Sequence, residues 1–172
     1  MDAGEFDRLV RDQLKPALRF ATRLSGDSAA AEEVVQEALF RTARAWQSFR
    51  GESSFRTWFF RIVVNTARDH LRVQQPHETL IDEPVDARAV DPRQGMVDQE
   101  TAEQVAREVA RLPQRQREVL VLIAYESHRI SEAAVVLEMS EQNARTNLHL
   151  ARQKLRQRLS KYLPKHWSKD AR

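Results

Sequence analysis

The amino-acid sequence predicts an all-α protein of two small helical domains joined by a flexible linker. Long stretches carry apolar residues at helical spacing, and no stretch of useful length alternates apolar and polar residues as a half-buried strand would. Glycine and proline, which interrupt helices, are sparse, and three of the six prolines gather between residues 76 and 98. We therefore expect domains at residues 1–75 and 99–172, separated by a linker at residues 76–98.

The N-terminal domain is predicted to hold three helices, each with one apolar face. The first spans residues 5–24, and Pro16 is expected to kink or divide it, because proline lacks the amide hydrogen that a helix interior needs. The second spans residues 28–46. After a turn at residues 49–52, the third helix runs to about residue 73. Its aromatic residues expected in the core are Phe55, Trp58 and Phe59.

Four further helices are predicted after the linker, at residues 99–112, 114–126, 130–137 and 140–159. A short turn separates the last two, which is the layout of a helix-turn-helix, and the small Ala134 would let them pack closely. An ordinary helical hairpin has the same layout, so the chemistry of the exposed surface must distinguish the two.

The final predicted helix has an apolar face and an adjacent basic face, and its basic residues gather toward its C-terminal end. Ser140 is a good N-cap, and Gln142 and Asn143 in the first turn can hydrogen-bond to base edges. These features favour a helix that lies in a DNA major groove. A solvated basic surface is the alternative interpretation of the same stripe.

Charge is spread unevenly along the 172 residues, whose net charge is +3. Residues 76–103 hold 8 Asp and Glu against 2 Lys and Arg, which is typical of a solvated linker. Residues 104–172 hold 14 Lys and Arg against 7 Asp and Glu. A polyanionic partner is therefore expected for the C-terminal domain.

The composition disfavours several other classes of protein. The chain has no cysteines, which excludes disulfides and thiolate metal sites, and its five histidines lack the spacing of metal ligands. No nucleophile–base motif or phosphate-binding glycine loop is present, so we expect no enzyme, no cofactor and no bound metal. No apolar run reaches membrane-spanning length, and the N-terminus does not read as a signal peptide, so we expect a soluble cytoplasmic protein without membrane insertion.

Two blocks of sequence, one in each predicted domain, carry a resemblance to a known family. The C-terminal block comprises residues 112–120 and residues 148–155, and the N-terminal block comprises residues 31–38 and residues 49–67. Together they resemble the bacterial RNA polymerase sigma factors of the sigma-70 family. The size and the two-domain layout resemble the extracytoplasmic-function (ECF) group, the smallest of these factors.

The resemblance implies a protein that binds core RNA polymerase and directs promoter recognition, promoter melting and transcription initiation. The N-terminal domain would dock on the coiled coil of the β′ clamp and open the downstream (minus-ten) promoter element. The C-terminal domain would read the upstream (minus-thirty-five) element and contact the β flap. The residues implied in polymerase binding form an acidic and amide helix face, which could also be merely solvated: Glu32, Glu33, Gln36 and Glu37.

Opening DNA requires a base to leave the stack, and a pocket of backbone, hydroxyl and aromatic groups can receive it. The residues expected around this pocket are Phe49, Gly51, Ser53, Ser54 and Asn65. The residues expected to bind phosphates beside it are Arg61, Arg68 and Arg72. For the upstream element, the expected groove contacts are Gln142, Asn143, Arg145, Thr146, Asn147 and His149, and the expected phosphate contacts are Arg152 and Lys154.

Some positions depart from the family's usual pattern. Glu138 stands at the helix-turn-helix turn, where glycine is usual and where a left-handed backbone costs more with a side chain, so we expect a differently shaped turn. Its acid would also lie near DNA. Asn147 and Leu150 replace residues that are commonly basic. We therefore expect an unusual promoter sequence or weak upstream binding.

A helix-turn-helix regulator that acts without polymerase is the alternative function, with the N-terminal domain as a sensor or dimerisation unit. The acidic face argues against it, because a free-standing regulator has no need of Glu33 and Gln36 on its surface. ECF proteins are often held inactive by an anti-sigma partner that covers both domains, and the long linker would permit such wrapping.

Overall fold

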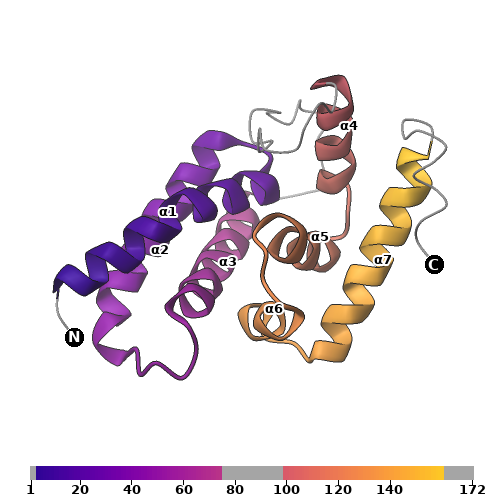
Figure 1. The fold of residues 1–172 in the computed structure, drawn as a ribbon. Helices are drawn as coiled ribbons and strands as arrows, with labels where there is room; N and C mark the ends of the chain where they lie inside the picture. Colours follow the sequence, from indigo (N-terminus) through magenta and orange to yellow (C-terminus); the bar gives the residue numbers. More distant parts are fainter. Residues whose placement is uncertain (1–2, 75–98, 161–172) are drawn as a thin grey trace.

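Figure 1 shows the computed structural model, which describes residues 3–74 and 99–160. Within these residues all regular elements are helical and no strand occurs. Helices α1–α3 form an N-terminal group and α4–α7 form a C-terminal group (Figure 1). The predicted all-α class with two small helical domains is confirmed. The linker predicted at residues 76–98 lies outside the described residues.

The N-terminal group consists of α1 (Ala3–Ser25), α2 (Ser28–Ala45), the short 3-10 turn η1 (Trp46–Ser48) and α3 (Phe55–Gln74). Helix α1 continues through Pro16, so the expectation that this residue would divide the helix is wrong. Proline leaves the carbonyl group four residues earlier without its helical donor. That carbonyl belongs to Asp12, an exposed residue at which water can supply the missing hydrogen bond.

The core of this group is largely aromatic. Phe20 of α1 and Phe59 and Phe60 of α3 are fully buried, and the rings of Phe20 and Phe60 meet edge to face at 5.5 Å. Val63 lies one turn further along α3 and is also fully buried. The aromatic start of α3 is therefore fixed against α1, which orients the loop that precedes it.

The C-terminal group consists of α4 (Gln99–Ala110), α5 (Gln114–Leu120), the π-helical turn η3 (Val121–Tyr125), α6 (Ile130–Leu137) and α7 (Glu141–Leu159). Helices α6 and α7 form the predicted helix-turn-helix, with Ala134 and Ala144 buried. The Ser140 hydroxyl accepts the Asn143 N–H at 3.2 Å and caps α7. Glu138 takes the left-handed conformation (φ 54°, ψ 51°), so the expectation of a differently shaped turn is wrong.

The two helical groups pack against each other. Helix α3 packs against α6 (Figure 1), and α1 contacts both α4 and η3. The buried apolar side chains of the two groups belong to one continuous core. The two domains that the sequence predicts are therefore packed together in this structure.

His128 is buried where the two groups meet. Its ring is 3% exposed and meets the Phe60 ring of α3 edge to face at 4.7 Å. Neither ring nitrogen has a hydrogen-bond partner within the described part of the chain. Burial, followed by the positive charge of Arg56, lowers the pKa of His128 to about 4. The packed arrangement therefore requires the neutral imidazole.

We predict that the protein loses stability as the pH falls from 6.5 toward 4. The pKa of His128 is lower in the folded chain than in the unfolded chain, so the unfolded state binds the proton first. The loss should approach roughly 3 kcal/mol near pH 4. Urea unfolding followed by circular dichroism measures this profile.

The matched control for this prediction is His128→Gln, whose side chain does not titrate. The acids Glu126 and Glu132 also lie near this junction, and they remain in both proteins. The difference between the two pH profiles therefore isolates His128. Parallel profiles would contradict the assignment.

Candidate polymerase and nucleic-acid interfaces

Helix α2 presents the predicted acidic and amide face to solvent. Glu32, Glu33, Gln36 and Glu37 are all exposed. The Glu37 carboxylate accepts from Arg41 at 2.8 Å, and Arg41 also reaches Asp69 of α3 at 2.9 Å. These two hydrogen bonds, led by the one to Asp69, raise the pKa of Arg41. Glu33 also reaches α3, because its carboxylate lies 3.1 Å from the His70 imidazole. The face is thus tied to α3 through both Arg41 and Glu33 while its side chains stay exposed.

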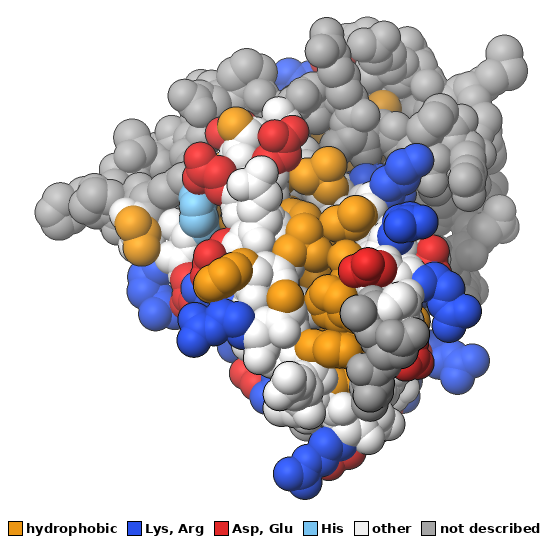
Figure 2. All heavy atoms as spheres, turned by 90° about the vertical axis from the view of Figure 1, so that its left-hand side faces the viewer, with side chains coloured by type: hydrophobic (Ala, Val, Ile, Leu, Met, Phe, Trp, Pro, Cys, Tyr) orange, Lys and Arg blue, Asp and Glu red, His pale blue; other side chains and the backbone are white. Residues whose placement is uncertain are grey.

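Phe40 adds an apolar group to this surface. Its side chain is 58% exposed on α2, and the Arg44 guanidinium lies 5.6 Å from the ring centroid. Figure 2 shows that hydrophobic side chains also gather on this side of the molecule, with charged side chains around them. Helical periodicity places Phe40 on the outer side of α2, and that outward position is the signal that could have identified it.

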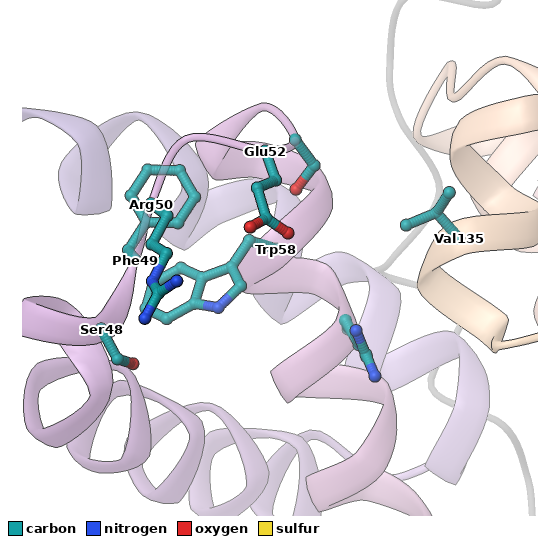
Figure 3. Close-up of a pocket in the computed structure, with 8 residues that line it drawn as sticks. Ser48, Phe49, Arg50, Glu52, Trp58 and Val135 are labelled. Carbon is teal, nitrogen blue, oxygen red and sulfur yellow. The ribbon is translucent and has the colours of Figure 1, made fainter.

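A pocket of about 480 Å³ opens beside the turn that leads into α3 (Figure 3). Phe49 and Trp58 form an aromatic wall, with their ring centroids 4.8 Å apart. Phe55 and Phe59 are buried as expected, and Trp58 is partly buried against the same core and also lines the pocket. The full lining is Ser48, Phe49, Arg50, Glu52, Ser53, Trp58, Arg61 and Val135.

Only some of the residues predicted for this pocket line it. Phe49 and Ser53 do. Ser54 instead caps α3, because its hydroxyl accepts the Thr57 N–H at 3.1 Å. Gly51 lies in the turn with φ 72°, a conformation that favours glycine, and does not line the pocket. Asn65 lies further along α3, where it accepts a hydrogen bond from Arg68.

The predicted phosphate-binding arginines of α3 are largely occupied by carboxylates of the C-terminal group. Arg68 donates to Glu118 through Nη2 at 2.7 Å and through Nε at 2.9 Å. Arg61 forms an ion pair with Glu138. Arg72 is 79% exposed, and its nearest carboxylate in the described chain is that of Asp69 at 3.9 Å.

A second group of arginines, on α1, neutralises a buried acid that the sequence did not reveal. Glu126 is 2% exposed and pairs with Arg19 at 3.2 Å and with Arg23 at 3.7 Å. Burial raises the pKa of Glu126, and these two cations oppose that rise. Arg23 also lies 4.3 Å from the ring centroid of Tyr125, whose pKa is raised by burial.

The predicted recognition helix α7 lies at the far edge of the molecule from α1 and α2 (Figure 1). Its predicted contact residues that are exposed are Gln142, Asn143, Arg145, Thr146, His149 and Arg152. Asn147 and Lys154 are half-buried, and the Asn147 amide donates to the Asn143 carbonyl at 2.8 Å. Arg145 pairs with Glu141 at 3.2 Å, which orients its guanidinium along the helix surface.

This architecture defines a two-part helical protein with a helix-turn-helix, and comparison with known proteins identifies the family. The model of sigma-70 region 2 matches residues 9–76, and that of sigma-70 region 4 matches residues 102–155. The ECF RNA polymerase sigma factor SigM of Mycobacterium tuberculosis is 33% identical over 154 residues, covering 90% of this chain and 76% of that protein.

Two further similarities agree with this match. The RNA polymerase sigma-H factor of Pseudomonas aeruginosa is 29% identical over 169 residues, covering 88% of this chain and 84% of that protein. The fold matches the sigma factor RpoE of Bartonella quintana, solved with the anti-sigma factor NepR, with a TM-score of 0.72 at 23% identity, covering 91% of this chain and 97% of that one. The chain belongs to the ECF group of the sigma-70 family.

None of the described helices combines the length and apolar character needed to cross a membrane. The described residues also contain no cluster of three or more His, Asp or Glu side chains that could hold a metal ion.

We predict that Ala134→Leu destabilises the protein by about 1–3 kcal/mol, because the added side chain overfills the wedge between α6 and α7. Ala134 is 4% exposed. The neighbouring substitution Val135→Leu is the control, since Val135 is 51% exposed and should tolerate it. Urea denaturation compares the two, and equal stability would show that the wedge is not tightly packed.

Proposed function

We propose that the protein binds core RNA polymerase and directs it to promoters, where the two domains contact separate DNA elements. The observation that carries this proposal is the separation of two exposed surfaces, an acidic face on α2 and a basic helix α7, at opposite sides of the molecule (Figure 1). Both partners can thus be bound at once. Run-off transcription with purified core polymerase, followed by mapping of start sites, tests the proposal, and failure to bind core polymerase or to select start sites would contradict it.

The α2 surface is our candidate for docking on the coiled coil of the β′ clamp. Carboxylates and an amide precede the exposed ring of Phe40 on α2, so a basic helical partner would find both charge complementarity and an apolar anchor. Arg41 fixes Glu37 in place before binding, which reduces the ordering cost on that side.

We predict that Glu33→Lys combined with Gln36→Ala weakens binding to core polymerase by about tenfold or more, because a like charge would face the basic partner. Affinity for upstream-element duplex DNA should stay unchanged. The matched control is Asp12→Lys with Gln13→Ala, which makes the same charge change on α1. Fluorescence anisotropy of labelled protein titrated with core polymerase measures both variants, and equal core affinity in the test variant would reject the α2 assignment.

For the downstream element, we propose that an unstacked base enters the pocket beside α3. The Phe49–Trp58 wall offers a stacking surface, and the Ser53 hydroxyl and the turn backbone offer polar contacts. Arg61, Arg68 and Arg72 would then hold the adjoining phosphates. The first two must leave their carboxylate partners to do so.

For the upstream element, we propose that the first two turns of α7 enter the major groove, with contacts near the β flap of the polymerase. Gln142 and Asn143 are exposed at the capped N-terminal end, as base contacts require. The Asn147 amide is already bonded to the helix backbone, so we expect a smaller contribution to base reading from this residue.

We predict that Arg145→Ala lowers affinity for the cognate upstream element by about 1–3 kcal/mol and relaxes discrimination between promoter variants. Arg107→Ala is the control, because Arg107 is an exposed arginine on α4. Competition binding with duplexes that differ at single base pairs measures both effects. A uniform loss of affinity across all duplexes would indicate that Arg145 contacts a phosphate and not a base.

We further propose that the protein supplies recognition and no catalysis, and that it acts in the cytoplasm, where the polymerase works. Sigma factors are DNA-recognition subunits, so the chemistry of RNA synthesis would belong to the polymerase. An anti-sigma partner is also proposed, because the fold matches a sigma factor solved with one.

A further inference from the structure

The contact between α3 and the C-terminal group is built on the arginines that we assign to promoter phosphates. Glu118 of α5 is fully buried, and both of its oxygens accept hydrogen bonds from Arg68, at 2.7 Å and 2.9 Å. Seven residues earlier on α3, Arg61 pairs with Glu138. The two pairs join the same faces of α3 and of the helix-turn-helix domain, so they act on one interface.

Glu138 occupies a position that does not favour its side chain. Its backbone is left-handed, with φ 54° and ψ 51°, a conformation that glycine adopts without steric cost. The hydrogen bonds that close the turn come from backbone atoms, including the Met139 N–H to the Ala134 carbonyl at 3.0 Å. The turn therefore does not use the Glu138 carboxylate, whose described partner is Arg61 of the other domain.

The same part of α6 also reaches the proposed base pocket. Val135 lies one turn before Glu138 and lines the pocket opposite the aromatic wall of Phe49 and Trp58 (Figure 3). Arg61 lines the pocket as well, so one segment of the C-terminal domain covers both the pocket and a phosphate-binding group beside it.

We propose that Glu118 and Glu138 form an intramolecular latch, which holds the free protein closed with its downstream-element surface covered. This proposal rests on the proposed function of that surface. A carboxylate and a phosphate bind a guanidinium through the same charge-assisted hydrogen bonds, so DNA and the latch compete for Arg61 and Arg68. Helix α7 keeps most of its recognition residues exposed, so upstream-element binding does not require the latch to open.

The strengths of the two pairs suit a latch that a partner can open. Arg61 and Glu138 are each about half-exposed, and such surface pairs contribute little. Glu118 has further partners within its own domain, Gln114 at 3.0 Å and Arg115 at 3.6 Å, so it stays paired when Arg68 leaves. Opening therefore leaves Glu118 paired, and a partner that prefers the open form can shift the population.

The first test measures closure in the free protein. Because the chain has no cysteines, Ala43→Cys and Ser131→Cys would place two dyes on exposed sites of α2 and α6. Energy transfer should fall in Glu138→Gln, and further in Glu118→Gln with Glu138→Gln, since fewer pairs hold the domains together. Glu138→Gly should also reduce energy transfer while raising the melting temperature, because it relieves the left-handed strain. A purely structural role for Glu138 predicts no change in energy transfer.

The second test uses a short mixed-sequence single-stranded DNA, because phosphate contacts are independent of sequence. Its affinity should rise about two- to threefold in Glu138→Gln, by the scale of an exposed ion pair, and by more in the double variant. Glu141→Gln is the matched control, because it also removes one acid of the helix-turn-helix but pairs within α7. It should leave energy transfer unchanged and should raise affinity less.

The outcomes separate the latch from the proposed function. Unchanged energy transfer in both folded variants would overturn the latch. A fall in energy transfer without a gain in single-stranded DNA affinity beyond that of Glu141→Gln would also overturn it, because the contact would then mask nothing. Run-off transcription by the wild-type holoenzyme is scored separately, and its failure would count against the proposed function whatever the energy transfer shows.

Discussion

The bidentate pair between Arg68 and Glu118 sets the relation between the two domains. A carboxylate with no exposed surface must be matched by a cation and by hydrogen bonds, because burying it alone would cost several kcal/mol. Arg68 supplies both from the other domain and is itself only 15% exposed. The apolar contact of α3 with α6 and the pairing of Arg61 with Glu138 belong to the same interface.

At this interface each domain contributes ion-pair partners of one sign. The N-terminal group contributes arginines, namely Arg19, Arg23, Arg61 and Arg68, and the C-terminal group contributes the acids Glu118, Glu126 and Glu138. The C-terminal third is nonetheless rich in basic residues, and those of α7 lie on its outer side. The C-terminal domain therefore presents acidic side chains to the N-terminal domain and basic side chains to solvent. This arrangement keeps the upstream-element surface open while the downstream-element surface is covered.

Much of the fold follows from local patterns in the sequence. Apolar spacing located the helices, Ser140 marked the start of α7, and the small Ala134 marked the helix-turn-helix, because each signal lies within a few residues of what it specifies. The site was predicted less completely. Trp58 has the spacing of a core residue, and only the path of the preceding turn shows that it faces a pocket. Pairing between Arg61 and Glu138, 77 residues apart, leaves no periodic signal at all.

Glu138 affects both the turn that contains it and the contact between the two domains. Within the helix-turn-helix it is an unfavourable choice, since it adds left-handed strain and an acid near the DNA-reading helix. Across the domain interface the same carboxylate neutralises an arginine that would otherwise stand beside the hydrophobic Val135. A residue that breaks a local rule and satisfies a distant partner stabilises one arrangement of the domains, and it adds nothing to the turn that carries it.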